Sequence, residues 1–511
     1  MSLPPPPSDD DVVVDPLLKE SDAPISVPDS NDASEGGKLK MILQLIKRSL
    51  GVKDLAAMRI SLPASLMEPV PNLEYWQYLD RPDLFAAIND STDPFERMLA
   101  VIRWTLSKDL KFVHGKVVKP YNSVLGEHFR SHWVVKPVTY PSDPNAPPIL
   151  HSHLTAAAPS LPPSETTSTK SSKKTAKSSS KVNSLGKSAP VTPLATGSAG
   201  TGELGEVLAA DISNLSLGAR SSNSDQASET LRVVFLTEQV CHHPPISSFY
   251  YSVPDKGVVA VGVDQMSAKV SPPASVRVVP GDRNKGIFVS LTSGPGQGEK
   301  YNVTHPMAVV TGLLRGSPYV TMTDSTYITA TPAPGETRHL RAIIEYKEES
   351  WIGRAQFLLE GAIFEYDPES EDHLEWTKVK HVPKERVVAT FDGSWQKRVY
   401  WKRAGESTKN LLIDLSTMLP VPKIVRPLED QIPFESQKLW ETVTSNLLSK
   451  NYNEATKQKQ IIEQAQRDRA AERKKTGQEF VPVYFLEDIS SGQPELTDAG
   501  RKAIEAELAL Q

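Results

Sequence analysis

Two adjacent histidines stand where an apolar segment ends. His242 and His243 follow the β-branched and aromatic run 231–236 and precede Pro244 and Pro245. The run is typical of a buried strand. Each proline lacks an N–H and has a fixed φ, so the pair ends regular strand pairing and holds the imidazoles rigidly at the strand end. An isolated His-His pair usually has a structural role, but two rigid ring N–H donors side by side suit an anion.

A second set of polar side chains has helical spacing. Lys459, Glu463 and Arg467 stand at i, i+4 and i+8 in a charged segment, about 454 to 475, that is predicted to be helical and to stop near Gly477. Each step of four residues turns a helix by about 40° beyond a full revolution, so the three side chains share one strip. Alone, such a strip is typical of a solvated ladder of charges. It also presents two cations and a carboxylate together.

A third segment, residues 119–127, reads Lys-Pro-Tyr-Asn-Ser-Val-Leu-Gly-Glu. Together the three segments resemble the signatures of the oxysterol-binding protein family of lipid carriers. The histidine segment resembles EQVSHHPP, with Cys241 in place of serine, and the third segment resembles KPxNPxLGE, with Ser123 in place of the second proline. The helical strip resembles the basic-acidic-basic helix of the family. The resemblance spans about residues 39 to 487, apart from an insertion.

The resemblance implies that the three segments meet at the mouth of a tunnel and bind the headgroup of phosphatidylinositol 4-phosphate. A phosphomonoester carries about −1.5 to −2 charges at neutral pH and needs several donors. Histidine supplies ring N–H groups, lysine a point charge and arginine a planar fork. Glu463 would accept hydrogen bonds from inositol hydroxyls. Glu127 would either contact the headgroup or only stabilise the turn that contains it. The candidate headgroup residues are Lys119, Asn122, His242, His243, Lys459, Glu463, Arg467 and Glu127.

The cargo and its cover also follow from the resemblance. A sterol or phosphatidylserine would compete with the acyl chains of the phosphoinositide for one apolar tunnel, and the sequence leaves the choice open. Residues 38–50 have apolar side chains at helical spacing among lysines and arginine, which predicts either a short helix docked on the core or a basic amphipathic lid. The resemblance favours the lid. Its apolar residues are Leu39, Ile42, Leu43, Ile46 and Leu50.

The fold class expected from the pattern is mainly β with α. Strands at short intervals without intervening helices indicate a large antiparallel sheet that curls or closes into a barrel. The full prediction is a near-closed β-barrel, enclosing a lipid tunnel by resemblance, with an N-terminal lid helix, a small helical layer at 71–109 and a C-terminal helical subdomain at about 436–475 with Ser436 as N-cap. Strand signals stop after residue 402. The expected strands are 129–135, 231–236, 247–253, 258–263, 275–279, 286–291, 307–314, 319–322, 340–346, 354–366, 386–391 and 396–401.

Composition sets the domain boundaries. Residues 1–37 are rich in Pro, Asp and Ser and predict a disordered tail, and about 141 to 229 predict a disordered insertion. The insertion contains Lys-Ser repeats, which are usually a solvated segment and alternatively a site for acidic membranes or phosphorylation. One lipid-binding domain is expected at 38–487, with a lid at about 38–60 and a C-terminal tail at 488–511.

Bulk properties exclude several classes. A net charge of −5 argues against nucleic-acid binding, and one cysteine argues for a reducing compartment. With no signal-peptide pattern and no apolar run long enough to span a bilayer, we expect a cytosolic protein that touches membranes peripherally and reversibly.

No catalytic residue, cofactor or metal is expected, because the sequence lacks His-Glu-x-x-His, Gly-x-Ser-x-Gly and a phosphate loop. Two alternatives stay open at this point: a phosphoester-processing enzyme, and a lipid sensor that binds without transporting. No motif identifies a protein partner.

Overall fold

The computed structural model describes residues 25–26, 60–61, 64, 67–114, 118–152, 230–271, 275–313, 318–349 and 354–510. The expected lid residues Leu39, Ile42, Leu43, Ile46 and Leu50 lie outside the described residues, as do most of the expected N-terminal tail and residues 153–229 of the expected insertion. None of the described helices is both long and apolar enough to cross a bilayer.

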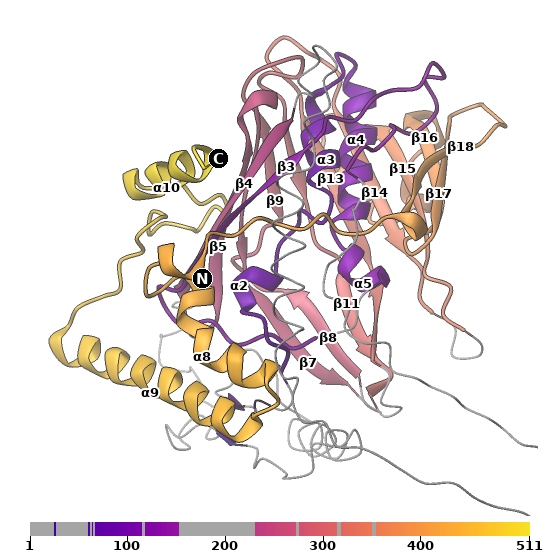
Figure 1. The fold of residues 1–511 in the computed structure, drawn as a ribbon. Coiled ribbons are helices and arrows are strands. Elements are labelled where there is room, and N and C mark those ends of the chain that lie inside the picture. Colours follow the sequence, from indigo (N-terminus) through magenta and orange to yellow (C-terminus); the bar gives the residue numbers. More distant parts are fainter. Residues whose placement is uncertain are drawn as a thin grey trace, which may run out of the picture. The chain divides into compact units, whose positions relative to one another are not determined.

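One antiparallel sheet of twelve strands dominates the fold (Figure 1). Its order is β18-β17-β16-β15-β14-β13-β10-β9-β6-β5-β4-β3, so neighbouring strands are mostly consecutive in the chain. Each predicted strand overlaps an observed one. The strands of this sheet are β3 (His128–Val135), β4 (Leu231–Cys241), β5 (Ile246–Val253), β6 (Val258–Asp264), β9 (Ile287–Leu291), β10 (Lys300–Val303), β13 (Ser325–Thr331), β14 (Leu340–Tyr346), β15 (Leu358–Glu365), β16 (Val387–Ser394), β17 (Arg398–Arg403) and β18 (Asn410–Asp414).

The sheet is curled without closing. Strands β3 and β18 are its two edges, and no ladder joins them in the described part of the chain. The edge at β3 is instead covered by a later segment, because His132 and Ile424 exchange backbone hydrogen bonds of 3.0 and 2.7 Å. The predicted mainly β architecture is confirmed, with an open rather than a fully paired barrel.

A smaller sheet continues from one end of the large one. It has the order β12-β11-β8-β7, with β7 (Met266–Ser271), β8 (Ser275–Pro280), β11 (Met307–Thr311) and β12 (Tyr319–Thr323). Strand β7 begins two residues after β6 ends at Asp264, and Asp264 pairs with Ser247 near the start of β5. The small sheet therefore lies at the end of the large sheet where β4 turns into β5.

Short helices pack against the apolar interior of the large sheet. They are α2 (Asn72–Tyr75), α3 (Pro82–Ala86), α4 (Pro94–Ser107) and α5 (Leu110–His114). Helix α4 begins after Asp93, whose carboxylate accepts from the Phe95 N–H, with Pro94 at the first helical position. Its residues Phe95, Met98 and Leu99 are completely buried. These helices and the strands facing them share one hydrophobic core, and the predicted helical layer is confirmed.

The remaining helices lie late in the chain, either between two strands of the large sheet or after its last strand. Helix α7 (Asp372–Glu375) lies between β15 and β16, and α8 (Ser436–Leu448) and α9 (Tyr452–Thr476) form the predicted C-terminal helical pair. Helix α9 ends at Gly477, which has φ +66° and so occupies the left-handed region that glycine tolerates best. Strands β1 (Ile25–Ser26) and β2 (Ile60–Ser61) form a separate parallel pair.

Six of the described strands were not predicted from the sequence, and two of them are β1 and β2, which have two residues each. Strands β7, β10 and β13 are short or rich in Ser, Thr, Lys and Asn, so their apolar alternation is weak. Strand β18 lies beyond residue 402, where strand signals were expected to stop, and is also an error of prediction. It was missed because it has only five residues and follows a polar stretch, so its own strand propensity is weak. Pairing with β17 stabilises it.

Three boundary predictions were wrong. The chain is ordered through residue 152, because Thr139 and Ile149 form a β-bridge inside the expected insertion. Residues 488–511 are not a free tail: α10 (Asp498–Leu508) packs Ala503 and Ile504 against β4. Ser436 is the first helical residue of α8 rather than its N-cap, and its hydroxyl donates to the interior carboxylate of Glu127.

Candidate functional site

The two histidines form the turn of a β-hairpin. Cys241 of β4 pairs with Ile246 of β5, and residues 242–245 connect them. The centroids of the two imidazole rings lie 4.4 Å apart, with His243 exposed and His242 half-buried. The hairpin therefore places two ring donors next to each other where the large sheet meets the small one.

The segment 119–127 is attached to that hairpin by backbone hydrogen bonds. The Gly126 N–H donates to the Gln239 carbonyl at 2.9 Å, and the Gln239 N–H donates to the Glu127 carbonyl at 2.8 Å. Gly126 has φ +80°, and a β-carbon there would approach the Phe480 ring to 3.2 Å. The positive φ favours glycine at this position, and a β-carbon would also require the Phe480 ring to shift slightly.

Glu127 is a structural anchor of the loop. Its carboxylate is fully buried and accepts from the Val124 N–H at 3.0 Å, the Ser436 hydroxyl at 2.8 Å and the Trp440 indole N–H at 3.1 Å. Burial raises its pKa to about 7, and these three hydrogen bonds oppose the rise. The carboxylate of Glu127 thus stabilises the turn and links it to α8. This is the structural role that the sequence offered as the alternative to headgroup contact.

Aromatic packing presses the same loop onto the C-terminal helices. The rings of Tyr121 and Trp440 have centroids 4.8 Å apart, and the Tyr121 hydroxyl lies 3.1 Å from the Thr444 hydroxyl. The loop, α8 and α9 share a small hydrophobic cluster that includes Ala455 of α9. The segment 119–124 is therefore held between the sheet on one side and the helices on the other.

This packing brings Lys119 to the charged strip of α9. The Lys119 ammonium donates to the Asn122 side-chain oxygen at 2.7 Å and to the Pro120 carbonyl at 2.9 Å. Although the residue as a whole is exposed, its ammonium lies among many protein atoms, and this burial lowers the pKa of Lys119 to about 8. The positive charge of Lys459 lowers it further, while Glu463 acts in the opposite direction. The two segments are therefore electrostatically coupled.

The strip itself contains a buried ion pair. Lys459 is 1% exposed, and its ammonium lies 2.6 Å from the Glu463 carboxylate. A buried lysine needs such a partner, because an uncompensated charge inside a protein is costly. The carboxylate of Glu463 accepts a hydrogen bond from the Lys459 ammonium and fixes its direction.

Arg467 lies farther along the same helix. Eight residues separate it from Lys459, about 12 Å along a helix axis. Its guanidinium makes two hydrogen bonds to the Gln464 side-chain oxygen, at 3.0 and 2.9 Å. The predicted strip is confirmed as a helical face, but the structure records no contact between Arg467 and the other candidate residues it describes.

The 119–127 loop is hydrogen-bonded to β4 at Gln239, three residues before His242. The same loop packs on α9, which contains the charged strip. We call Lys119, Asn122, His242, His243, Lys459 and Glu463 the headgroup cluster. Lysine, histidine and asparagine donors together with a carboxylate are the side-chain types that suit a phosphorylated polyol, in which the phosphate accepts from the donors and the hydroxyls donate to the carboxylate. Sequence reasoning missed the residues that position the cluster, Gln239 and Trp440, because their partners are distant in the chain.

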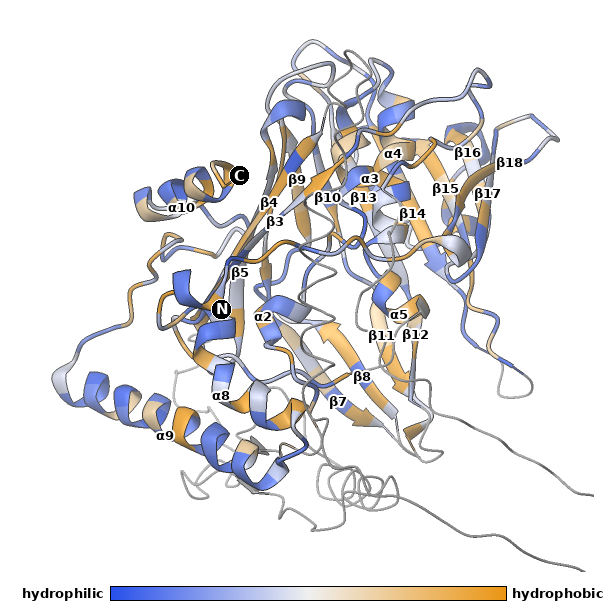
Figure 2. Cartoon of the chain, viewed as in Figure 1, coloured by the Kyte–Doolittle hydropathy of each residue, from blue (hydrophilic) through white to orange (hydrophobic). Residues whose placement is uncertain are grey.

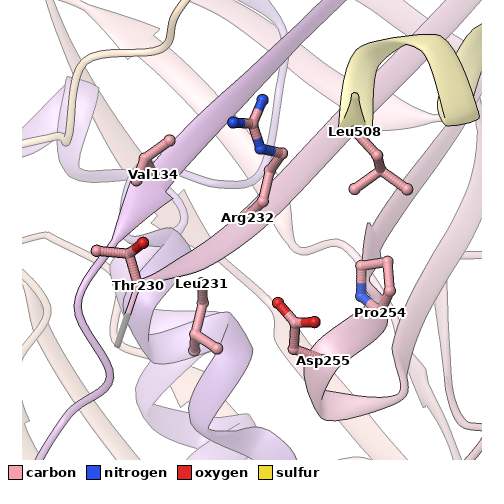
Figure 3. Close-up of a pocket in the computed structure, with 7 residues that line it drawn as sticks. All are labelled: Val134, Thr230, Leu231, Arg232, Pro254, Asp255 and Leu508. Atoms are coloured by element: carbon pink, nitrogen blue, oxygen red, sulfur yellow. The ribbon is translucent and has the colours of Figure 1, made fainter. Parts of the chain in front are cut away.

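A hollow of about 430 Å³ lies at the other end of β4 (Figure 3). Leu231 and Arg232 line it from the start of that strand, while the histidines follow its end. The Arg232 guanidinium there donates to the Glu507 carbonyl near the end of α10 at 3.3 Å. This hollow is separate from the headgroup cluster, and its arginine serves to cap a helix.

Comparison with known families identifies the chain's relatives. The model of the family described as oxysterol-binding protein matches residues 41–189 and 223–453. Oxysterol-binding protein-like protein 1 of Schizosaccharomyces pombe is 39% identical over 519 residues, which cover 96% of this chain and 97% of that protein. Oxysterol-binding protein homolog 6 of Saccharomyces cerevisiae is 24% identical over 467 residues, which cover 91% of this chain and 77% of that protein.

Solved structures share the fold. The Osh1 ORD domain in complex with cholesterol aligns with a TM-score of 0.55 at 16% identity, covering 94% of this chain and 91% of that one. The Osh3 ORD in complex with PI(4)P from Saccharomyces cerevisiae aligns with a TM-score of 0.53 at 14% identity, covering 91% and 93%. At these identities the likeness concerns the fold.

Proposed function

The chain belongs to the oxysterol-binding protein family, and from this membership and the geometry of the headgroup cluster we propose that it carries lipids between membranes. It binds phosphatidylinositol 4-phosphate and a second lipid, a sterol or phosphatidylserine, in the same apolar space and exchanges them. It works in the cytosol and contacts membrane surfaces transiently. The observation that carries the proposal is that the 119–127 loop is hydrogen-bonded to the strand of the histidine hairpin at Gln239 and also packs on α9, the helix with the Lys459–Glu463 ion pair.

The phosphoinositide part of the proposal rests on charge. Burial, and secondly the positive charge of Lys459, lower the pKa of Lys119 to about 8, so the two lysines interact as like charges. Two like charges brought together without a bound anion are unfavourable. A phosphate dianion relieves this repulsion, and the ring N–H groups of His242 and His243 add directed donors. The relatives support the ligand, since the Osh3 ORD was solved with PI(4)P.

The second-lipid part rests on the small sheet. In β8 and β11 the valines, alanine and methionine on both faces are only half-buried, whereas inward residues of the large sheet are fully buried. Figure 2 shows the hydrophobic colouring of these strands, which lie at the same end of the fold as α8 and α9. An apolar wall that protein atoms cover only partly suits a lipid chain or a sterol ring system. The Osh1 ORD was solved with cholesterol.

Transfer between liposomes tests the proposal. Donor liposomes contain fluorescent phosphatidylinositol 4-phosphate and acceptors contain either ergosterol or phosphatidylserine. We expect the protein to move the phosphoinositide to the acceptors, and to do so faster when the matching second lipid travels back. Binding without any transfer would support the sensor instead and contradict the carrier. Native mass spectrometry after exposure to mixed lipids then names the second cargo.

The proposal is a carrier rather than an enzyme. A phosphoester-processing enzyme would use the same histidines, lysines and carboxylate in acid-base chemistry. Incubation with phosphoinositide labelled in its phosphate separates the two. We expect the label to remain in the lipid, and steady release of inorganic phosphate by purified protein would overturn the carrier assignment.

Headgroup binding should depend on pH in a defined direction. Lys119, with a pKa of about 8, is protonated below that value and loses its charge above it. The phosphate becomes a dianion above its second pKa of about 6. We therefore expect the highest affinity between about pH 6 and pH 8, and roughly tenfold weaker binding well above pH 9, a loss of about 1.4 kcal/mol. Titration of a short-chain phosphatidylinositol 4-phosphate by calorimetry measures it.

Two variants identify the group responsible for that pH dependence. Lys119→Met removes the titrating ammonium, so its binding should be weak and nearly independent of pH above 8. Lys474→Met removes an exposed lysine from the last turn of α9 and should keep the wild-type profile. An unchanged alkaline decline in Lys119→Met would show that another group causes it.

A further inference from the structure

A hollow of about 260 Å³ lies away from the headgroup cluster, between the helices α3 and α4, the edge strand β18 and residues 147–152. In Figure 1, α4 and β18 lie in the upper part of the view, and α8 and α9 lie at the lower left. None of the residues lining the hollow belongs to the headgroup cluster. Most of its wall is apolar. The apolar lining includes Leu84, Pro147, Pro148, Leu150, Leu411 and Met418.

One wall contributes a buried cation. Arg103 of α4 is only 6% exposed, and its Nε donates to the Leu412 carbonyl of β18 at 3.1 Å. It forms no ion pair with any carboxylate in the described part of the chain. Arg97, six residues earlier on the same helix, shows the usual arrangement, because it is equally buried and pairs with Glu299. A guanidinium taken out of water is normally compensated in that way.

The other charged groups near the hollow are already occupied. The Arg81 guanidinium donates from Nε to the Asp83 carboxylate at 2.9 Å, and the Asp414 carboxylate lies 2.6 Å from Nε of Arg398. These pairs neutralise themselves. Arg103 is therefore the lining charge whose terminal N–H groups remain available, among the residues that the structure places around this hollow.

The carboxylate whose charge acts on Arg103 is also engaged elsewhere. Glu96 acts on Arg103 through its charge, but its carboxylate contacts the Arg403 guanidinium at 3.2 Å. Burial lowers the pKa of Arg103, and Glu96 and Tyr140 offset this in part. Arginine stays charged in proteins despite such shifts, so the hollow contains a guanidinium charge that no carboxylate of the described residues pairs directly.

A second polar atom points to a ligand. The hydroxyl oxygen of Ser152, which also lines the hollow, is buried and has no hydrogen-bond partner. A buried hydroxyl without a partner is uncommon and destabilising. One guanidinium and one hydroxyl are few donors for a phosphate dianion but suit a planar carboxylate, which the guanidinium binds through two parallel hydrogen bonds. The apolar remainder of the wall suits a hydrocarbon body.

We propose that this hollow binds a medium-chain monocarboxylate, with the carboxylate on Arg103 and Ser152 and the hydrocarbon chain against Leu84, Leu150 and Met418. At about 30 Å³ for a water-sized group, the volume holds roughly nine such groups, which is the size of an eight-carbon chain and its carboxylate. The site is independent of the lipid exchanged at the headgroup cluster.

Calorimetric titration of the full chain with octanoate tests the proposal, with octanol and inorganic phosphate as comparison ligands. Octanoate should bind saturably with one site and raise the melting temperature, whereas octanol and phosphate at equal concentration should bind at least tenfold more weakly. Equal binding of octanol, which has no carboxylate, would show that Arg103 does not bind the ligand and would contradict the proposal. Equal binding of phosphate would make the site a general anion site and overturn the assignment to an apolar carboxylate.

Variants locate the binding. Arg103→Met keeps the apolar stem and should lose at least tenfold in octanoate affinity, while Lys409→Met removes an exposed cation that pairs with Asp392 outside the hollow and should bind like the wild type. Leu150→Trp fills the hollow from its partly exposed wall and should block binding with Arg103 intact, which keeps the test decisive if Arg103→Met is unfolded. Octanoate affinity that survives Leu150→Trp would place binding elsewhere and refute the proposal.

Discussion

A double variant, His242→Ala with His243→Ala, is expected to lose extraction of phosphatidylinositol 4-phosphate from liposomes while unfolding at nearly the wild-type temperature. The histidines occupy a hairpin turn outside the ladder, with His243 exposed and His242 half-buried. Their removal leaves the strand pairs of β4 and β5 in place. Each hydrogen bond to a charged group contributes about 1.5–3 kcal/mol, so loss of both should weaken headgroup binding by at least a hundredfold.

Extraction by liposome flotation and thermal unfolding by circular dichroism measure the two parts of this result. His381→Ala is the matched control, because His381 is an exposed histidine before β16 and outside the headgroup cluster. It should extract the lipid normally. A double variant that unfolds many degrees early would show that the histidines are structural, and normal extraction would remove them from the site.

Glu127→Ala is expected to cause the largest loss of stability, about 3–5 kcal/mol. The carboxylate is the acceptor for three buried donors, namely the Val124 N–H, the Ser436 hydroxyl and the Trp440 indole. Deleting it leaves all three without a partner, and each unsatisfied buried group costs about 1–3 kcal/mol, with incomplete additivity. Because the loop and α8 are joined there, headgroup binding should fall as well, even though Glu127 contacts no ligand in the proposed complex.

Urea unfolding measures this loss, and the pH dependence identifies its source. Burial raises the pKa of Glu127 to about 7 from an ordinary 4.5. Its contribution is therefore complete below the unfolded-state pKa and declines as pH rises through about 7. The wild type should lose stability over that window more steeply than Glu127→Ala. Glu441→Ala, which breaks an exposed pair with Lys438 on the same helix, should change stability by less than about 1 kcal/mol. An equally mild Glu127→Ala would contradict the anchor role.

The sequence by itself determined the class of fold and the identity of the candidate residues. The β-branched and aromatic residues of β5, β6 and β14 and the fixed spacing of Lys459, Glu463 and Arg467 are local patterns, and local patterns can be read without coordinates. The histidine hairpin was legible for the same reason, because a long apolar strand and two prolines stand next to each other in the chain.

Only the tertiary structure decided which side chains meet and which merely support. Lys119 and Lys459 interact electrostatically although they are far apart in sequence. Glu127, a candidate headgroup residue, is buried and accepts hydrogen bonds from Ser436 and Trp440, which gives it a structural role. Strand β18 was missed because its stability comes from pairing with β17. Helix α10 does have a local signal, with Thr497 as its N-cap and apolar residues at helical spacing, and only its packing on β4 depends on a distant partner. Pairing and burial between distant segments depend on the whole packing of the sheet, and no local window of residues contains that information.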